Sequence, residues 1–173
     1  MRNLLLTLLL AGPMMALAET TNSPSVTGLA SLGFLVGGTW HGDLPPGPDG
    51  QKAGIEAQFE WTQNHQGIRF DSAWLLGGKK YPYTSGVYLW NPQSRKILIS
   101  YSDSEGALTT GTVNVADEVF VHDLQVIYSS GKTESVQTRL THSGNEDFTN
   151  SIYRLKDGHW DQFVAVHYGK LKP

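Results

Sequence analysis

Cysteine is absent from this chain of 173 residues. Its absence excludes disulfide bonds, thiolate metal ligands, a cysteine nucleophile and a lipid anchor on cysteine. Clusters of basic residues are absent too: 13 lysines and arginines are scattered among 16 acidic residues, and the net charge is −3. Because nucleic-acid binding relies on clustered basic side chains at the phosphates, we expect no nucleic-acid partner.

Familiar catalytic motifs are also missing. The chain has no Gly-x-Ser-x-Gly elbow, no His-Glu-x-x-His pair and no glycine loop that would hold a phosphate. These absences weaken the case for an enzyme. They do not close it, because a β-barrel can assemble a site from residues scattered over several strands.

Only the N-terminal stretch is long and apolar. Arg2 precedes an apolar run at residues 4–10, and Ala16-Leu17-Ala18 has the small-x-small pattern of a cleavage site. We interpret residues 1–18 as a secretory signal peptide, which is too short to span a membrane as a stable helix. The sequence therefore predicts a periplasmic or secreted protein with no stable membrane insertion after the signal is removed.

Two further parts follow the signal peptide. Residues 19–27 are polar and are interrupted by Pro24, which predicts a flexible leader. Residues 28–173 form one domain by length, large enough to bury a core without cross-links. Residues 28–34 have the composition of one helical turn, which we expect to cover the mouth of the fold.

Alternation of apolar and polar residues dominates the rest of the chain. It is clearest at residues 55–62, where Ile55, Ala57, Phe59 and Trp61 alternate with polar residues. A period of two indicates a half-buried strand, and about ten such segments are separated by turn sequences. The pattern predicts an all-β fold: a single antiparallel up-and-down β-barrel of about ten strands, with a short N-terminal helical turn.

Sequence motifs add a family resemblance. Gly38-Thr39-Trp40, at the start of the first strand and after a helical turn, resembles the calycin superfamily of lipocalins, fatty-acid-binding proteins and nitrobindin-like barrels. Residues 35–42, 59–62 and 86–92 are most similar to an uncharacterised, mostly bacterial family of secreted lipocalin-like domains. This resemblance covers residues 29–169 and implies no established activity.

The resemblance implies roles for two residues and leaves a third without one. Gly38 and Trp40 would be structural, with Trp40 closing one end of the barrel beneath a basic side chain. In nitrobindin-like barrels a histidine late in the chain ligates haem iron. His167 lies late here, but the motif around it is not matched, so the ligand role is not carried over.

Four aromatic residues predict the wall of a binding cavity. Phe59 and Trp61 share the apolar face of one predicted strand, and Phe70 and Trp74 share that of the next. Ten strands enclose a barrel wide enough to leave space that side chains do not fill. We expect these four side chains on the inner wall, in contact with a ligand.

Two histidines are the polar candidates for the same site. His122 lies at an even-numbered position, as do the more apolar residues of 119–128. His142 likewise shares the alternating positions of the core-facing residues in 133–142. Two inward histidines can orient a polar ligand or bind a metal or haem. The alternative for each is a hydrogen-bonded interior histidine or a solvated one at the rim.

The leading hypothesis is a binding barrel for a small apolar or amphipathic molecule, without catalysis and without a cofactor. Three alternatives stay open: an enzyme of the cyclase or isomerase kind that uses the interior histidines, a haem-binding barrel, and a structural or interaction domain with a filled interior. An unfilled cavity would separate the first three hypotheses from the last.

Overall fold

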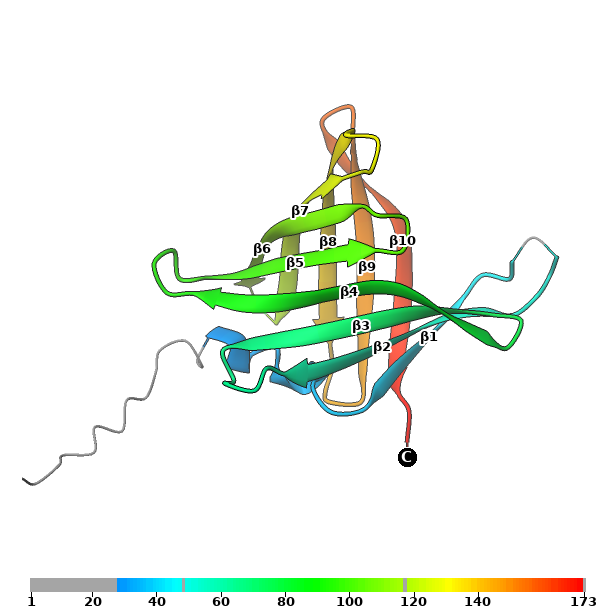
Figure 1. The fold of residues 1–173 in the computed structure, drawn as a ribbon, viewed down its shortest axis with the longest axis horizontal. Helices are drawn as coiled ribbons and strands as arrows, with labels where there is room; N and C mark the ends of the chain where they lie inside the picture. The colour runs from blue at the N-terminus through cyan, green and yellow to red at the C-terminus, as the bar shows by residue number, and fades with distance from the viewer. Residues whose placement is uncertain (1–27, 48, 117, 173) are drawn as a thin grey trace, which may run out of the picture.

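The computed structural model describes residues 28–47, 49–116 and 118–172, and shows a closed antiparallel barrel of ten strands (Figure 1). The predicted all-β, up-and-down barrel is confirmed. The predicted signal peptide (1–18) and leader (19–27) lie outside the described residues. The elements are η1 (Gly33–Leu35), β1 (Thr39–Leu44), β2 (Ala53–Trp61), β3 (Gly67–Leu76), β4 (Lys79–Asn91), β5 (Lys96–Asp103), β6 (Leu108–Ala116), β7 (Val119–Ile127), β8 (Thr133–His142), β9 (Asp147–Lys156) and β10 (His159–Lys170).

Each strand pairs with its neighbour in sequence, and β1 closes the barrel by pairing with β10. The closing register sets Trp40 opposite Lys170 and Gly42 opposite Tyr168. Closure gives every strand a neighbour on both sides, although β1 pairs with only the last part of β10. Within the described part of the chain, we find no helix with the length and hydropathy needed to cross a membrane.

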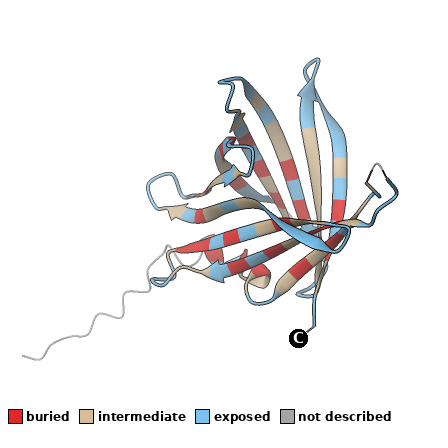
Figure 2. Ribbon diagram, turned by 45° about the vertical axis from the view of Figure 1, so that its right-hand side comes forward, coloured by how far each residue is buried: buried red, intermediate tan, exposed pale blue. Residues whose placement is uncertain are grey.

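Alternation in the sequence becomes alternation between the two faces of the wall. In β2, Ile55, Ala57 and Phe59 are buried, whereas Gln58 and Glu60 are exposed. Figure 2 shows the same banding of buried and exposed residues along the other strands. Because successive side chains of a strand point to opposite faces, one parity fills the interior and the other meets water.

The two ends of the barrel differ. We call the end that carries η1 and the turns at 62–66 and 143–146 the closed end, and the end with the turns at 77–78 and 157–158 the open end. Five side chains of the closed end have 0% exposure: Leu29, Leu32, Leu35, Trp40 and Ile68. The helical turn covers one end of the barrel, and that end is the one where β1 begins, because only three residues link η1 to β1.

Trp40 forms the floor of the closed end. Its indole Nε1 donates a hydrogen bond to the carbonyl of Leu35 at 2.7 Å, and the Lys170 ammonium lies 5.2 Å from the ring centroid. Gly37 and Gly38, which precede it, have φ angles of +80° and +112°. Glycine is required for such a turn because L side chains rarely adopt these angles.

Irregularities in the ladder lie toward the open end. The register between β3 and β4 shifts between Asp71 and Ala73, and that between β9 and β10 shifts between Gln162 and Val164. In the second case the extra residue is Phe163. Such bulges bend a strand and redirect a side chain at a barrel rim.

Candidate functional site

An interior cavity of about 450 Å³ lies between the floor at Trp40 and the open end. Its volume falls within the range of roughly 300–1,000 Å³ typical of small-molecule sites. It reaches solvent at the open end, because Phe163 lines it and is nevertheless 61% exposed. The lining residues are Leu44, Ile55, Ala57, Phe59, Phe70, Ser72, Trp74, Tyr83, Thr84, Tyr88, Ile99, Tyr101, His122, Leu124, Thr138, Leu140, Phe148, Asn150, Ile152, Phe163, Val164, Val166 and Tyr168.

Three of the four predicted aromatic residues line this cavity. Phe59 and Phe70 oppose each other on β2 and β3, with ring centroids 5.8 Å apart. Trp74 lies nearer the open end and packs on Tyr83 at 4.5 Å. These rings form an apolar wall on the β2–β4 side, as the parity of the sequence indicates.

Trp61 is not among the lining residues, although it has the inward parity. The hairpin turn at 62–66 leaves Trp61 beside the closed end, opposite Ile68, while Trp74 pairs with Ile55 toward the open end. Trp61 packs near η1 and stacks with His65 at 5.8 Å. The structure therefore places the two tryptophans at opposite ends of the barrel.

His122 lies in the cavity wall and is only 3% exposed. Its Nδ1 lies 3.2 Å from the carbonyl of Phe120, and its Nε2 lies 3.2 Å from the hydroxyl of Tyr88. A carbonyl only accepts, so Nδ1 carries the proton and Nε2 accepts a hydrogen bond from Tyr88. Burial lowers the pKa of His122 to about 4, and hydrogen bonds to the backbone of Phe120 and Thr138 oppose the shift only in part.

His142 has the same inward parity but does not line the cavity. Its ring stacks on Phe34, beside η1, with centroids 3.9 Å apart, and lies 5.9 Å from Phe120. Its Nδ1 donates to the carbonyl of Gly144 at 2.9 Å. His142 therefore packs into the closed end, outside the cavity that His122 lines.

Sequence reasoning missed several polar residues of the cavity, among them Tyr88, Asn150 and Tyr168. Burial raises the pKa of both tyrosine hydroxyls. Asn150 has a buried Oδ1 without a hydrogen-bond partner among the described residues. Parity along β4, β9 and β10 could have signalled all three, because Asn150 lies between Phe148 and Ile152 at a spacing of two.

The other histidines face outward. His41 pairs with Asp43 at 3.3 Å, and the Asp43 side chain is 96% exposed. His167, whose direction the sequence left undecided, is exposed and contacts the Thr149 hydroxyl at 3.2 Å. Across the described residues no group of three or more histidine, aspartate or glutamate side chains is placed to hold a metal ion.

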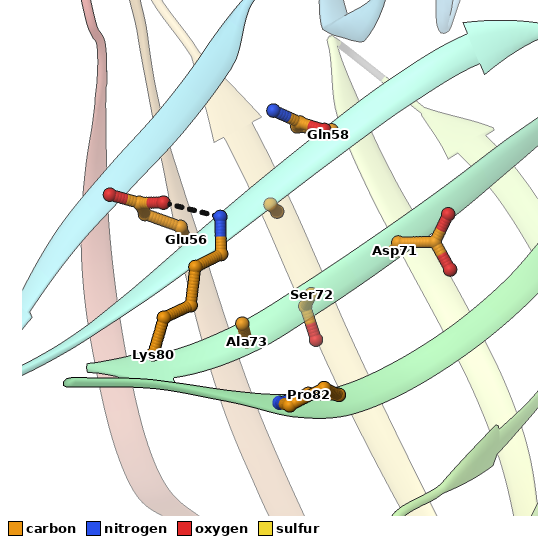
Figure 3. A pocket seen from close by; sticks show the side chains of 8 residues that line it. Glu56, Gln58, Asp71, Ser72, Ala73, Lys80 and Pro82 are labelled. Atoms are coloured by element: carbon orange, nitrogen blue, oxygen red, sulfur yellow. Dashed lines mark hydrogen bonds and ion pairs between the residues drawn. The ribbon is translucent and has the colours of Figure 1, made fainter. Parts of the chain in front are cut away.

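A second hollow, of about 380 Å³, lies against the wall formed by β2, β3 and the start of β4 (Figure 3). Lys80 crosses it and binds Glu56 at 2.8 Å. Gln58 and Asp71, from the exposed face of the sheet, also line it. Because its rim is charged and largely solvated, we regard the interior cavity as the candidate site.

Neither a family model nor a curated protein sequence matches the chain. A solved structure does share the fold. The crystal structure of Rv2717c from M. tuberculosis matches with a TM-score of 0.56 and 13% identity, over 87% of this chain and 99% of that chain. At this identity the likeness shows the barrel fold alone.

Proposed function

We propose that the protein binds a small apolar or amphipathic molecule inside the barrel, without catalysis. The observation that carries the proposal is the cavity of about 450 Å³, lined mostly by aromatic and aliphatic side chains and open at one end. Burial of apolar ligand surface there contributes roughly 25 cal/mol per Å², before the costs of association. A filled structural core would leave no such space.

The test uses a neutral dye whose emission rises in apolar surroundings, N-phenylnaphthylamine. Val164→Trp fills the cavity near the open end, whereas Ala165→Trp adds the same ring to the outer face of the same strand. We expect the wild type and Ala165→Trp to bind the dye, and Val164→Trp to lose at least about ten-fold in affinity. Equal dye binding by both variants would reject the interior site.

His122 is the residue best placed to hold a ligand's polar head. His122→Ala should weaken binding of a hydrogen-bonding ligand by about 1–3 kcal/mol through a lost hydrogen bond. His159→Ala, at an exposed position of the β9–β10 hairpin, should leave binding unchanged. Circular dichroism of both variants controls for loss of the fold.

A second candidate is proton transfer on a bound ligand, as in a cyclase or isomerase. The contact of Tyr88 with His122 inside the cavity favours it. A pKa of about 4 makes His122 a weak base at neutral pH, and catalytic bases work best with a pKa near the operating pH. Binding without catalysis therefore stays the leading proposal.

We also propose that the protein is related to the calycins and that it is exported from the cytoplasm. The calycin assignment is supported by Trp40, which closes the barrel beneath Lys170. Export is supported by the signal-like pattern of residues 1–18, with cleavage after Ala18. N-terminal sequencing of exported protein should begin at Glu19; a start at Met1 would reject the signal peptide.

A further inference from the structure

A group of buried polar side chains lies in the deeper part of the cavity. Tyr88, His122 and Thr138 are all buried, and Thr138 pairs with His122 across β7 and β8. With Nδ1 bonded to a backbone carbonyl, His122 presents Nε2 and the Tyr88 hydroxyl to the interior as a linked acceptor and donor. A ligand hydroxyl or carbonyl can join such a pair by exchanging one hydrogen bond for another.

Asn150, on β9, adds an amide to the lining. Its Oδ1 is buried and has no hydrogen-bond partner among the described residues. A buried polar atom without a partner costs about 1–3 kcal/mol, so native proteins rarely leave one unexplained. An amide offers a donor and an acceptor, and its unpartnered end can serve a ligand in either orientation.

Ionised side chains are absent from the lining. None of the described residues that line the cavity is aspartate, glutamate, lysine or arginine, and burial keeps His122 neutral. A charged head group would lose its hydration there without gaining a counter-ion, which costs several kcal/mol or more. The cavity can therefore hydrogen-bond an uncharged polar head group, but binding of a charged head group there is unfavourable.

A basic side chain beside the mouth is already partnered. Arg154 lies 3.6 Å from Glu134, and its guanidinium stacks on Phe163 at 3.9 Å. Glu134 also accepts a hydrogen bond from the Tyr128 hydroxyl at 2.6 Å. The pair is close to neutral as a unit, so it offers little net attraction to a carboxylate.

Apolar side chains surround the outer part of the cavity. Leu44, Trp74 and Phe163 line it near the open end, and the hydroxyls of Ser72 and Thr84, which also line it, are bonded to each other. An amphipathic molecule that matches this distribution enters head first and leaves its apolar tail toward the mouth.

We propose that the cavity selects uncharged amphipathic molecules, with a hydroxyl, ketone or amide head held by His122, Tyr88 and Asn150. The apolar tail lies against Trp74 and Phe163, and carboxylates and ammonium ions are excluded. This inference rests on the proposed function, because it names the ligand class of the same cavity.

Four probes that share the same length of carbon chain and differ in head group test the selection for uncharged molecules: decanol, decanamide, decanoate and decylammonium. Each competes with N-phenylnaphthylamine for the wild-type protein at neutral pH. We expect the alcohol and the amide to displace the dye at concentrations at least about ten-fold lower than either ion. Decanoate or decylammonium binding as tightly as the neutral probes would overturn the selection and leave the proposed function intact, whereas failure of the dye and all four probes would reject both. Dye binding without displacement by the neutral probes would overturn the selection alone.

Asn150→Leu tests the head-group contact directly. Ser151→Ala is the matched control, because Ser151 is the next residue of β9 and is not among the cavity residues. We expect Asn150→Leu to weaken decanamide binding about five-fold or more and Ser151→Ala to leave it unchanged. Decanamide binding at wild-type strength in a folded Asn150→Leu variant would contradict the assignment. Thermal unfolding of both variants shows whether each is folded.

Discussion

The indole nitrogen of Trp40 donates a hydrogen bond to the carbonyl of Leu35 across a distance of 2.7 Å. This bond ties the first strand to the 3-10 turn that precedes it, and both residues have 0% exposure. A buried carbonyl of this kind needs a donor, since an unpaired one costs free energy. The closed end is thus built from a local contact, only five residues apart in sequence.

Removal of the Trp40 ring should destabilise the barrel strongly. Trp40→Ala should lower the free energy of unfolding by about 3–5 kcal/mol, as for truncation of a large core side chain. Trp40→Phe keeps a ring but loses the bond to Leu35, and should cost about 1–3 kcal/mol. Urea unfolding measures both, with the exposed Trp160→Ala expected to change stability by no more than about 0.5 kcal/mol. A loss below about 1 kcal/mol for Trp40→Ala would contradict the role of Trp40 as the floor.

The Lys170 ammonium should contribute through its contact with the Trp40 ring. Lys170→Met keeps an aliphatic stem and removes the charge, so the free energy of unfolding should fall by about 0.5–2 kcal/mol. Lys172→Met, at an exposed position two residues later, should have an effect within about 0.5 kcal/mol of zero. Equal effects of the two substitutions in urea unfolding would show that the cation over Trp40 adds nothing.

Stability should depend on pH through His122. Burial lowers the pKa of His122 to about 4, against roughly 6.5 for an unperturbed histidine. Between these values the unfolded chain binds a proton that the folded chain does not. The contribution of neutral His122 to the free energy of unfolding is therefore complete above about pH 6.5. It is lost as the pH falls toward 4, by roughly 3 kcal/mol in all.

Urea unfolding at about pH 7 and about pH 4.5 measures this loss. Because other groups also titrate over the interval, the informative quantity is the difference between the wild type and His122→Gln, which carries no titratable ring. We expect a smaller acid-induced loss in His122→Gln and a wild-type loss in the exposed His159→Gln. Identical pH profiles for the wild type and His122→Gln would contradict a buried, neutral His122.

Two tryptophans should respond differently to a ligand. Trp74 lines the cavity, whereas Trp61 packs near η1 at the closed end. Trp74→Phe should therefore remove most of the change in tryptophan emission on addition of decanol, and Trp61→Phe should preserve it. A response that vanishes with Trp61 and survives without Trp74 would place the ligand at the closed end.

Trp61 and His142 show which part of a residue's position the alternation along a strand predicts. Both point inward, as the alternation of their strands predicts, but both lie at the closed end and outside the cavity. Alternation specifies the face of a strand, since successive side chains point to opposite sides. It carries no information on depth along the barrel, which depends on how hairpins align neighbouring strands.

The sequence by itself determined the number and pairing order of the strands and the inward direction of Phe59, Phe70 and His122, because these follow from a local period of two and from turn residues. The tertiary structure alone decided the rest. Closure of β1 on β10 brings Lys170 over Trp40. Side chains from nine of the strands enclose the cavity, and the Oδ1 of Asn150 in its wall has no hydrogen-bond partner among the described residues. Both outcomes depend on contacts between residues distant in sequence, and no local pattern encodes them.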